Sequence, residues 1–128
     1  RMDKWVAQQK FWEEFGIPAY PEQSFFPEGS EPSLPHITYE PMTGRFGQTM
    51  RTSASIWYRD GDWKAIDEKA QEIADFIGDY YIKKIDGGYM RVTIPDSSPF
   101  AQQRASGSSD EFIKCMYIIV DIEFFTRY

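Results

Sequence analysis

The sequence predicts one α+β domain with the order α–β–β–α–β–β, a mainly antiparallel or mixed sheet, and helices packed on one face. The strongest indication is the stretch 112–127, which contains no Gly or Pro. Its alternate residues from Met116 to Phe124 are apolar, as in a strand with one face on a core. Leu occurs only as Leu34, whereas Ile, Phe, Tyr and Trp are plentiful, which favours a sheet-rich protein. A length of 128 residues suits a single core, so residues 1–128 are expected to form one domain.

The composition excludes several classes of protein. With 41% hydrophobic and 17% aromatic residues, the chain is expected to be an ordered globule. It has no apolar run long enough for a membrane span and no signal-peptide pattern. Met2 is expected to be the native start, with Arg1 a remnant. The net charge of −6 opposes general attraction to nucleic acid, although it is compatible with a passive wall facing DNA.

The cysteine and histidine counts limit metal and redox chemistry. Cys115 and His36 are single examples of their residue types, so an internal disulfide is impossible and a Cys/His zinc site lacks ligands within one chain. We therefore expect the chain to fold in a reducing cytoplasm.

A first helix is predicted over 3–15, with Asp3 at its start and Gly16 at its end. Large and polar residues recur there at helical spacing, namely Trp5, Gln8 or Gln9, Trp12 and Phe15. Two tryptophans in one short helix are expected to anchor it in the core. The alternative is an exposed docking helix.

Residues 16–35 are predicted to form a long loop rich in Pro, Gly and Ser. A loop of this length in a compact domain is either functional or mobile. Phe25-Phe26 in its middle either fixes it to the body or is available to a partner.

Two strands, 36–40 and 48–59, are predicted to form an antiparallel hairpin. In the second strand, alternation separates an apolar face from a mixed one. The apolar face comprises Met50, Thr52, Ala54, Ile56 and Tyr58, and the mixed face comprises Arg51, Ser53, Ser55, Trp57 and Arg59.

The best helical pattern covers 63–77, after a turn in which Asp60 or Asp62 is expected to cap the helix. Gly78 is expected to end it. Residues 79–85 either extend this helix or form a short extended piece before the Asp86-Gly87-Gly88 turn, and we favour the extended piece. A strand over 89–94 and a polar loop over 96–111 precede the final strand.

Candidate catalytic groups are few. His36 has no accompanying nucleophile motif, which favours a structural or surface role. Cys115 is expected to be a small buried hydrophobic residue. Asp121 and Glu123 share one strand face and could in principle hold a metal or transfer protons. A solvated or subunit-facing sheet explains them more simply, but a small enzyme or ligand-binding domain using these carboxylates and His36 remains an alternative.

The second half of the chain carries a recognisable order of segments. They are Asp86-Gly87-Gly88-Tyr89-Met90, Ser98-Pro99-Phe100-Ala101-Gln102, Asp110-Glu111 and the strand 113–124. This pattern resembles the C-terminal half of tail terminator proteins, which are minor capsid, head–tail joining proteins of long-tailed phages and prophages. The first half resembles that family only in the order of its elements.

The resemblance implies a structural role in the virion, without catalysis, cofactor or metal. Such a protein assembles in the host cytoplasm, forms a hexameric ring on the finished tail tube, stops tube polymerisation and joins the head connector. The implied partners are copies of itself, the tube protein, the connector and passing DNA that is not bound specifically; no membrane is involved. Another head–tail connector or tail-completion protein is the nearest alternative.

A ring requires contact surfaces on opposite sides of each subunit. We expect the mixed face of the strand 48–59 and the loop 96–111 to contribute. The residues are Arg51, Trp57, Arg59, Pro99, Phe100, Gln102, Gln103 and Arg104. The simpler alternative is that Trp57 covers the core of the monomer and the loop is solvated.

Overall fold

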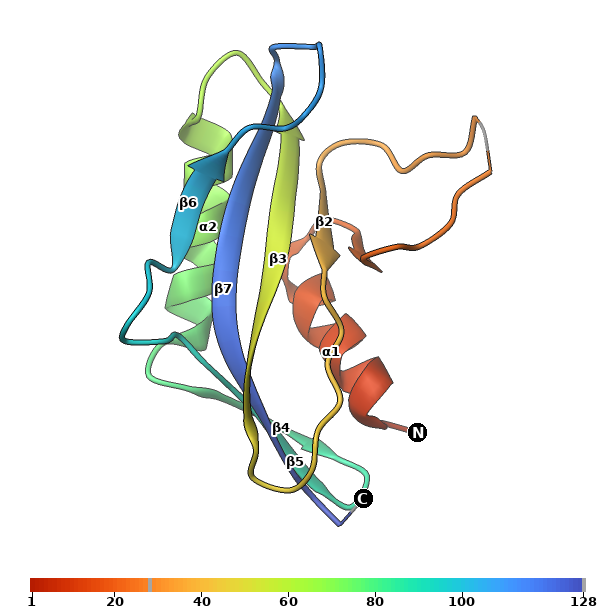
Figure 1. The fold of residues 1–128 in the computed structure, drawn as a ribbon, viewed down its shortest axis with the longest axis vertical. Helices are drawn as coiled ribbons and strands as arrows, with labels where there is room; N and C mark the ends of the chain where they lie inside the picture. Colours follow the sequence, from red (N-terminus) through yellow and green to blue (C-terminus); the bar gives the residue numbers. More distant parts are fainter. Residues whose placement is uncertain (28, 128) are drawn as a thin grey trace.

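The longest strand, β7 (Ile113–Thr126), lies at the centre of a curled mixed sheet of seven strands. β3 (Thr49–Arg59) pairs antiparallel along one edge of β7. The other edge of β7 is shared, because β6 (Ala101–Arg104) pairs with its first part and β5 (Gly88–Thr93) with its last. The computed structural model describes residues 1–27 and 29–127 as one compact α+β domain with two helices (Figure 1).

The remaining strands complete the sheet order β1-β2-β3-β7-β5-β4, with β6 beside β7. β2 (His36–Tyr39) pairs antiparallel with β3, which confirms the predicted hairpin. β1 (Ala19–Pro21) pairs parallel with β2, and β4 (Tyr81–Ile85) forms a hairpin with β5.

Three strands were not among the main strands predicted, so the predicted order α–β–β–α–β–β is not confirmed; the observed order is α–η–β–β–β–α–β–β–β–β, where η is a short 3-10 turn. β1 interrupts the predicted loop 16–35, and β6 interrupts the predicted loop 96–111. Both are short, and neither has the alternation that reveals β3 and β7. β4 is the extended piece favoured for residues 79–85, since the preceding helix ends at Ile77.

Alternation in the two long strands separates a core-facing side from a mixed side, as predicted. Even-numbered residues of β7 from Met116 to Phe124 are buried in the core, together with Met50, Ala54 and Ile56 of β3. Directly opposite residues of an antiparallel pair share a face. The odd-numbered residues of both strands therefore form the other face, which we call the outer sheet face.

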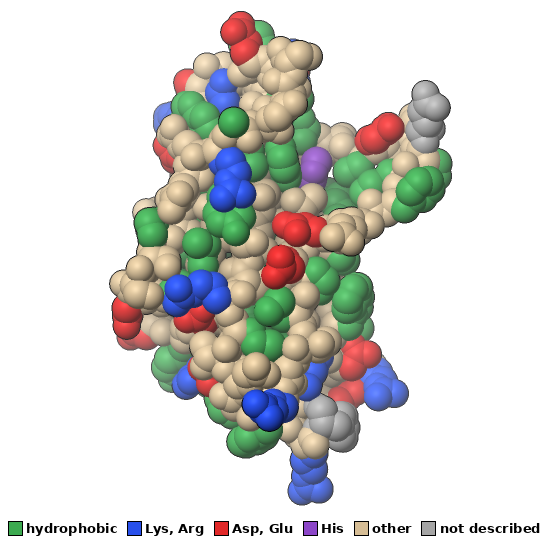
Figure 2. Space-filling view, viewed as in Figure 1, with side chains coloured by type: hydrophobic (Ala, Val, Ile, Leu, Met, Phe, Trp, Pro, Cys, Tyr) green, Lys and Arg blue, Asp and Glu red, His purple; other side chains and the backbone are tan. Residues whose placement is uncertain are grey.

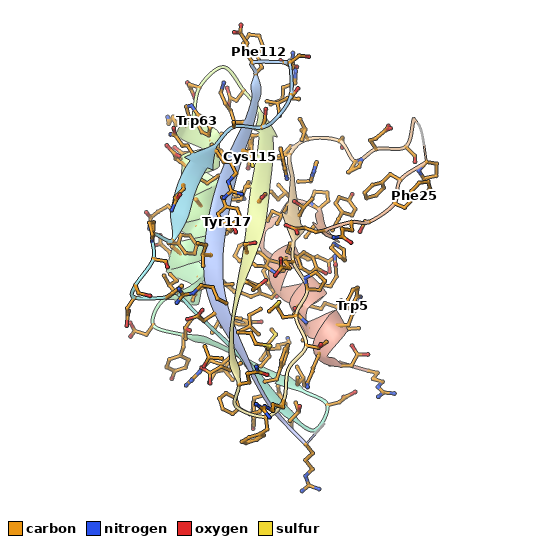
Figure 3. The ribbon with its side chains drawn as sticks, in the orientation of Figure 1. Trp5, Phe25, Trp63, Phe112, Cys115 and Tyr117 are labelled. Carbon is orange, nitrogen blue, oxygen red and sulfur yellow. The ribbon has the colours of Figure 1, made fainter. Side chains whose placement is uncertain are left out.

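The first helix, α1 (Lys4–Trp12), continues as a short 3-10 turn, η1 (Glu13–Phe15). Its predicted boundaries are confirmed: the Asp3 carboxylate accepts a hydrogen bond from the Val6 N–H, and Gly16 ends the element in the left-handed conformation. The prediction that both of its tryptophans anchor it in the core is confirmed for one and wrong for the other. Trp12 is buried, but Trp5 is 53% exposed because it lies on the turn that leaves the core (Figure 3).

The second helix, α2 (Lys64–Ile77), buries Ile66, Ile73 and Ile77 as the pattern predicts. Trp63, rather than an aspartate, occupies the N-cap position, although the Asp62 carboxylate accepts a hydrogen bond of 2.9 Å from the Lys64 N–H. α2 contacts β3 and β7, whereas α1 contacts β1 and β4. Neither helix is long and apolar enough to cross a membrane within residues 1–27 and 29–127.

Candidate assembly surface

The outer sheet face combines arginines, carboxylates and aromatic rings drawn from five strands. Its side chains of opposite charge are interspersed across β3 and β7 (Figure 2). This face carries Arg51, Trp57 and Arg59, which the sequence predicted as assembly residues. The alternation of the two long strands places them there, because residues 51, 57 and 59 are all odd-numbered.

Three arginines of this face form separate pairs with carboxylates. Arg51 Nε lies 3.2 Å from Asp121 Oδ1, Arg91 Nη2 lies 2.7 Å from Glu123 Oε1, and Arg59 Nε lies 3.1 Å from Asp110 Oδ2. Asp121 and Glu123 are therefore each neutralised by a cation of a neighbouring strand. This arrangement suits a structural surface, because paired carboxylates are poor candidates for binding a metal or transferring protons.

The loop before β7 is held by Asp110. Its carboxylate accepts a hydrogen bond from the Phe112 N–H at 2.9 Å as well as from Arg59. The backbone hydrogen bond, followed by the Arg59 guanidinium, lowers the pKa of Asp110 below its ordinary value. Arg59 also lies over the Phe112 ring, 5.3 Å from its centroid.

Trp57 packs across β2. Its Nε1–H donates a hydrogen bond of 2.9 Å to Thr38 Oγ1, and its ring stacks with that of His36 at 6.4 Å. Burial lowers the pKa of His36, against the opposing effect of a hydrogen bond to the Ser33 carbonyl. Trp57 is half-buried on the outer face and is absent from the core, so the idea that it covers the core was wrong.

Arg104 is the arginine of this face that has no carboxylate partner in the part of the chain that the structure describes. Its guanidinium carbon lies 3.6 Å from the centroid of the Tyr117 ring. Cys115, the opposite residue in the β6–β7 register, is buried as predicted, and burial raises the pKa of its thiol. The sequence did not indicate Tyr117, since its role depends on Arg104 being carried by an adjacent strand.

The predicted residues of the segment 96–111 are divided between two surfaces. Gln102 and Arg104 lie opposite Tyr117 and Cys115, and so belong to the outer sheet face. Phe100 and Gln103 instead line a groove of about 300 Å³ between β6 and α2. Pro99 is exposed before β6.

The groove between β6 and α2 has a floor of small and apolar side chains. The residues of its floor and walls are Ala70, Ala74, Phe100, Ala101 and Met116. Its polar rim consists of Asp67, Gln71 and Gln103.

The structure does not bring together His36, Asp121 and Glu123, the residues of the alternative enzyme or ligand-binding hypothesis. His36 is opposite Trp57, and Asp121 is opposite Arg51. Six residues of β3 separate these positions, a distance of about 20 Å along a strand. Among residues 1–27 and 29–127, no three His, Cys, Asp or Glu side chains are grouped to hold a metal ion.

A further exposed feature is the segment between β1 and β2. We call its described residues, 22–27 and 29–35, the arm. Phe26 packs edge-to-face on Tyr20 at 5.2 Å, whereas Phe25 is 87% exposed on the arm (Figure 3). The adjacent phenylalanines in a Pro-rich stretch indicated this possibility, but only the structure separates their roles.

Comparisons of the chain with protein-family models, with curated proteins and with solved structures found no match. The functional interpretation therefore depends on the residues and on the surfaces described above.

Proposed function

We propose that this chain is a structural virion protein that forms a ring on the end of a phage tail tube, ends tube polymerisation and joins the tube to the head connector. The observation that supports this most is the position of β6. The segment Pro99-Phe100-Ala101-Gln102, which carries most of the resemblance to tail terminators, leads into this edge strand, with Phe100 and Ala101 packed against the core and Pro99 and Gln102 exposed. An exposed edge strand is suited to contact between subunits.

The outer sheet face supports the same proposal. In the proposed ring, α2 packs against β3 and β7 within the subunit, and the outer sheet face meets neighbouring subunits. Its arginine–carboxylate pairs and half-buried rings resemble the mixed composition of protein interfaces. Pairs of this kind fix the register of a contact more than they strengthen it.

The charge of the chain fits a ring through which DNA passes. At −6 the protein repels the phosphate backbone, which favours sliding over retention. A determined ring with a lumen lined mainly by Lys and Arg would contradict this part of the proposal.

The test is the length of tails assembled without the protein. Particles from a phage or prophage that lacks this chain should contain overlong tails that are not joined to heads. Expression of the intact chain in trans should restore both defined length and joining. Normal, joined tails in its absence would refute the proposal, whereas tails of normal length that fail to join heads would favour another head–tail connector.

A further inference from the structure

We propose that the arm of one copy of this chain binds β6 of the next copy, with Phe25 inserted in the groove between β6 and α2. This inference rests on the proposed ring and names the contact that would build it. The partner is a second copy of this chain, because the arm and the groove are complementary and lie on different sides of one molecule.

The arm is exposed but has local order. Ser24 and Ser30 each donate backbone and side-chain hydrogen bonds to the carbonyl three residues earlier, so a tight turn lies on each side of Phe25-Phe26. An ordered arm loses less conformational entropy on binding than a free one. Phe25 is 87% exposed among the described residues and is therefore an apolar group presented to solvent.

The groove has space and apolar surface for a ring. Its volume of about 300 Å³ is bounded by alanines on both α2 and β6, with Met116 in the floor. A small residue on each wall leaves a hollow that a phenyl group can fill. A buried aromatic anchor in a pocket of this kind is the usual source of most of the energy in a protein contact.

β6 also offers unpaired backbone groups beside the groove. Phe100 accepts a hydrogen bond of 2.9 Å from the Ile119 N–H, so the alternate residues Phe100, Gln102 and Arg104 direct their backbone groups toward β7. Ala101 and Gln103 direct theirs toward the open edge. An incoming backbone can form hydrogen bonds there.

Charge favours the same pairing. The described part of the arm contains Glu22 and Glu31 and no Lys or Arg. On the acceptor, Arg104 follows the groove residue Gln103 in β6 but lies on the outer sheet face, where it contacts a ring rather than a carboxylate. The other three arginines of the outer sheet face already have carboxylate partners. Arg104 is thus the arginine of this face that is available to an acidic arm.

The positions of the two surfaces determine the symmetry. The arm extends from the β1–β2 side of the molecule, and α2 and β6 lie on the opposite side (Figure 1). A contact between two different patches is heterologous, and repeating it produces a closed ring or a helical filament. An arm-to-β6 contact is therefore the type of contact that a tail-end ring requires.

Disulfide trapping tests the contact directly in the purified chain at high concentration. The native Cys115 is buried, so new thiols dominate the reaction. Phe25→Cys mixed with Gln103→Cys under a glutathione redox buffer should give mixed dimers, and the double variant should give a ladder of oligomers. The matched control replaces Gln103→Cys with Tyr80→Cys, a 61% exposed position outside the groove, and should give at least about tenfold fewer mixed dimers.

A charge reversal tests the electrostatic part. Arg104→Glu, added to the Gln103→Cys partner, should lower the yield of mixed dimers about tenfold, because the arm carboxylates are then repelled. Arg45→Glu, the same change in the 41–48 loop, should leave the yield unchanged. Glu31→Arg in the Phe25→Cys partner should restore part of the yield lost through Arg104→Glu.

Three results would overturn the inference: equal yields with Gln103→Cys and Tyr80→Cys, dimers that link only Phe25→Cys to itself, or a disulfide closed within a single chain of the double variant. Each is compatible with overlong tails in particles that lack the protein, so this contact can fail while the tail-end function stands. If particles that lack the protein have normal tails and the trapping result is positive, the chain associates with itself but has a function other than ending tails.

Discussion

The two carboxylates of β7 on the outer sheet face, Asp121 and Glu123, are each paired with an arginine of the same subunit. The pair Arg51–Asp121 is partly solvated, with side-chain exposures of 47% and 16%. Pairs of this kind contribute about 0–1 kcal/mol to stability. Their main effect is to keep both side chains in fixed positions, which favours a defined contact surface over general stickiness.

Gly88 is the residue whose replacement should be most damaging to the sheet. A Cβ on Gly88 would lie 1.7 Å from the Phe125 carbonyl oxygen, and neither backbone can move without breaking the β5–β7 pairing. Gly88→Ala should therefore lower the free energy of unfolding by about 2–3 kcal/mol. Urea denaturation followed by fluorescence measures the change.

Gly61→Ala is the matched control, because a Cβ there meets no atom within 4 Å and its φ is not in the left-handed region. Its unfolding midpoint should stay close to that of the parent. Equal effects of the two substitutions would show that the close approach at Gly88 is relieved by a shift of the chain.

Tyr39 should make the protein sensitive to high pH. Burial, with a smaller contribution from the charge of Glu13, raises the pKa of Tyr39 from 10.0 to about 12. Between these values the unfolded chain loses the phenolic proton while the folded chain retains it. The free energy of unfolding should therefore fall as pH rises from 10 to 12, in urea titrations at several pH values.

Tyr39→Phe provides the control for that titration. It removes the hydrogen bond from the Tyr39 hydroxyl to Gln9 Oε1 and so lowers stability at neutral pH. Its stability should decrease less steeply above pH 10. Tyr58 and Tyr81, whose pKa values are also raised by burial, account for the part of the slope that remains.

Among the elements, α1 is joined to the 41–48 loop by a buried amide, beside a hydrogen bond of 2.7 Å from Lys4 Nζ to the Gly44 carbonyl. Gln8 is 1% exposed; its Nε2–H donates to the Met42 carbonyl and its Oε1 accepts from the Met42 N–H, both at 2.7 Å. The side chain therefore pairs with Met42 as a neighbouring strand would. This explains a glutamine among the aromatic residues of the helical stripe.

Gln8→Leu should lower the free energy of unfolding by about 2–4 kcal/mol, since it leaves the N–H and carbonyl of the half-buried Met42 without their Gln8 partner and places an apolar side chain against them. Hydrogen exchange at the Met42 amide should accelerate more than that of β3 amides. The control Gln71→Leu, at an exposed position on α2, should change stability by less than about 0.5 kcal/mol. Equal losses of unfolding free energy in the two variants would mean that the hydrogen bonds of Gln8 to Met42 stabilise the fold no more than an exposed glutamine does.

The predictability of each element depends on length and alternation. β3 and β7 were predictable with their faces, because eleven and fourteen residues provide several alternations each. β6 was not, since Ala-Gln-Gln-Arg is short and polar and becomes a strand only by pairing with β7. β1 ends in a proline, which normally argues against a strand, and it is tolerated here at the sheet edge.

The candidate surface was predictable only in part for a related reason. Alternation placed Arg51, Trp57 and Arg59 on one face correctly. It could not show that Gln102 and Gln103 diverge to two surfaces, because that follows from the strand register of β6. Nor could it show that Trp5 is solvated, since helical spacing does not reveal where a helix leaves the sheet.

For the whole molecule, the overall charge leads to a simple binding prediction. At −6, and with three arginines of the outer sheet face already paired to carboxylates, we expect no shift of duplex DNA in a gel at about 50 mM salt. Binding that weakens as salt is raised would contradict a passive wall facing DNA.

The central place of β7 has a consequence for how the chain reaches its native state in the cell. β3 and β5 have their longest pairings with β7, yet both are synthesised before it. While the ribosome is translating the residues between 93 and 113, β3 and β5 can pair with β2 and β4, but the edges that pair with β7 stay uncovered. At about 5–20 residues per second this interval lasts a few seconds at most. The domain must therefore complete its folding after β7 leaves the exit tunnel, and chaperones that bind exposed strand edges would act in that interval.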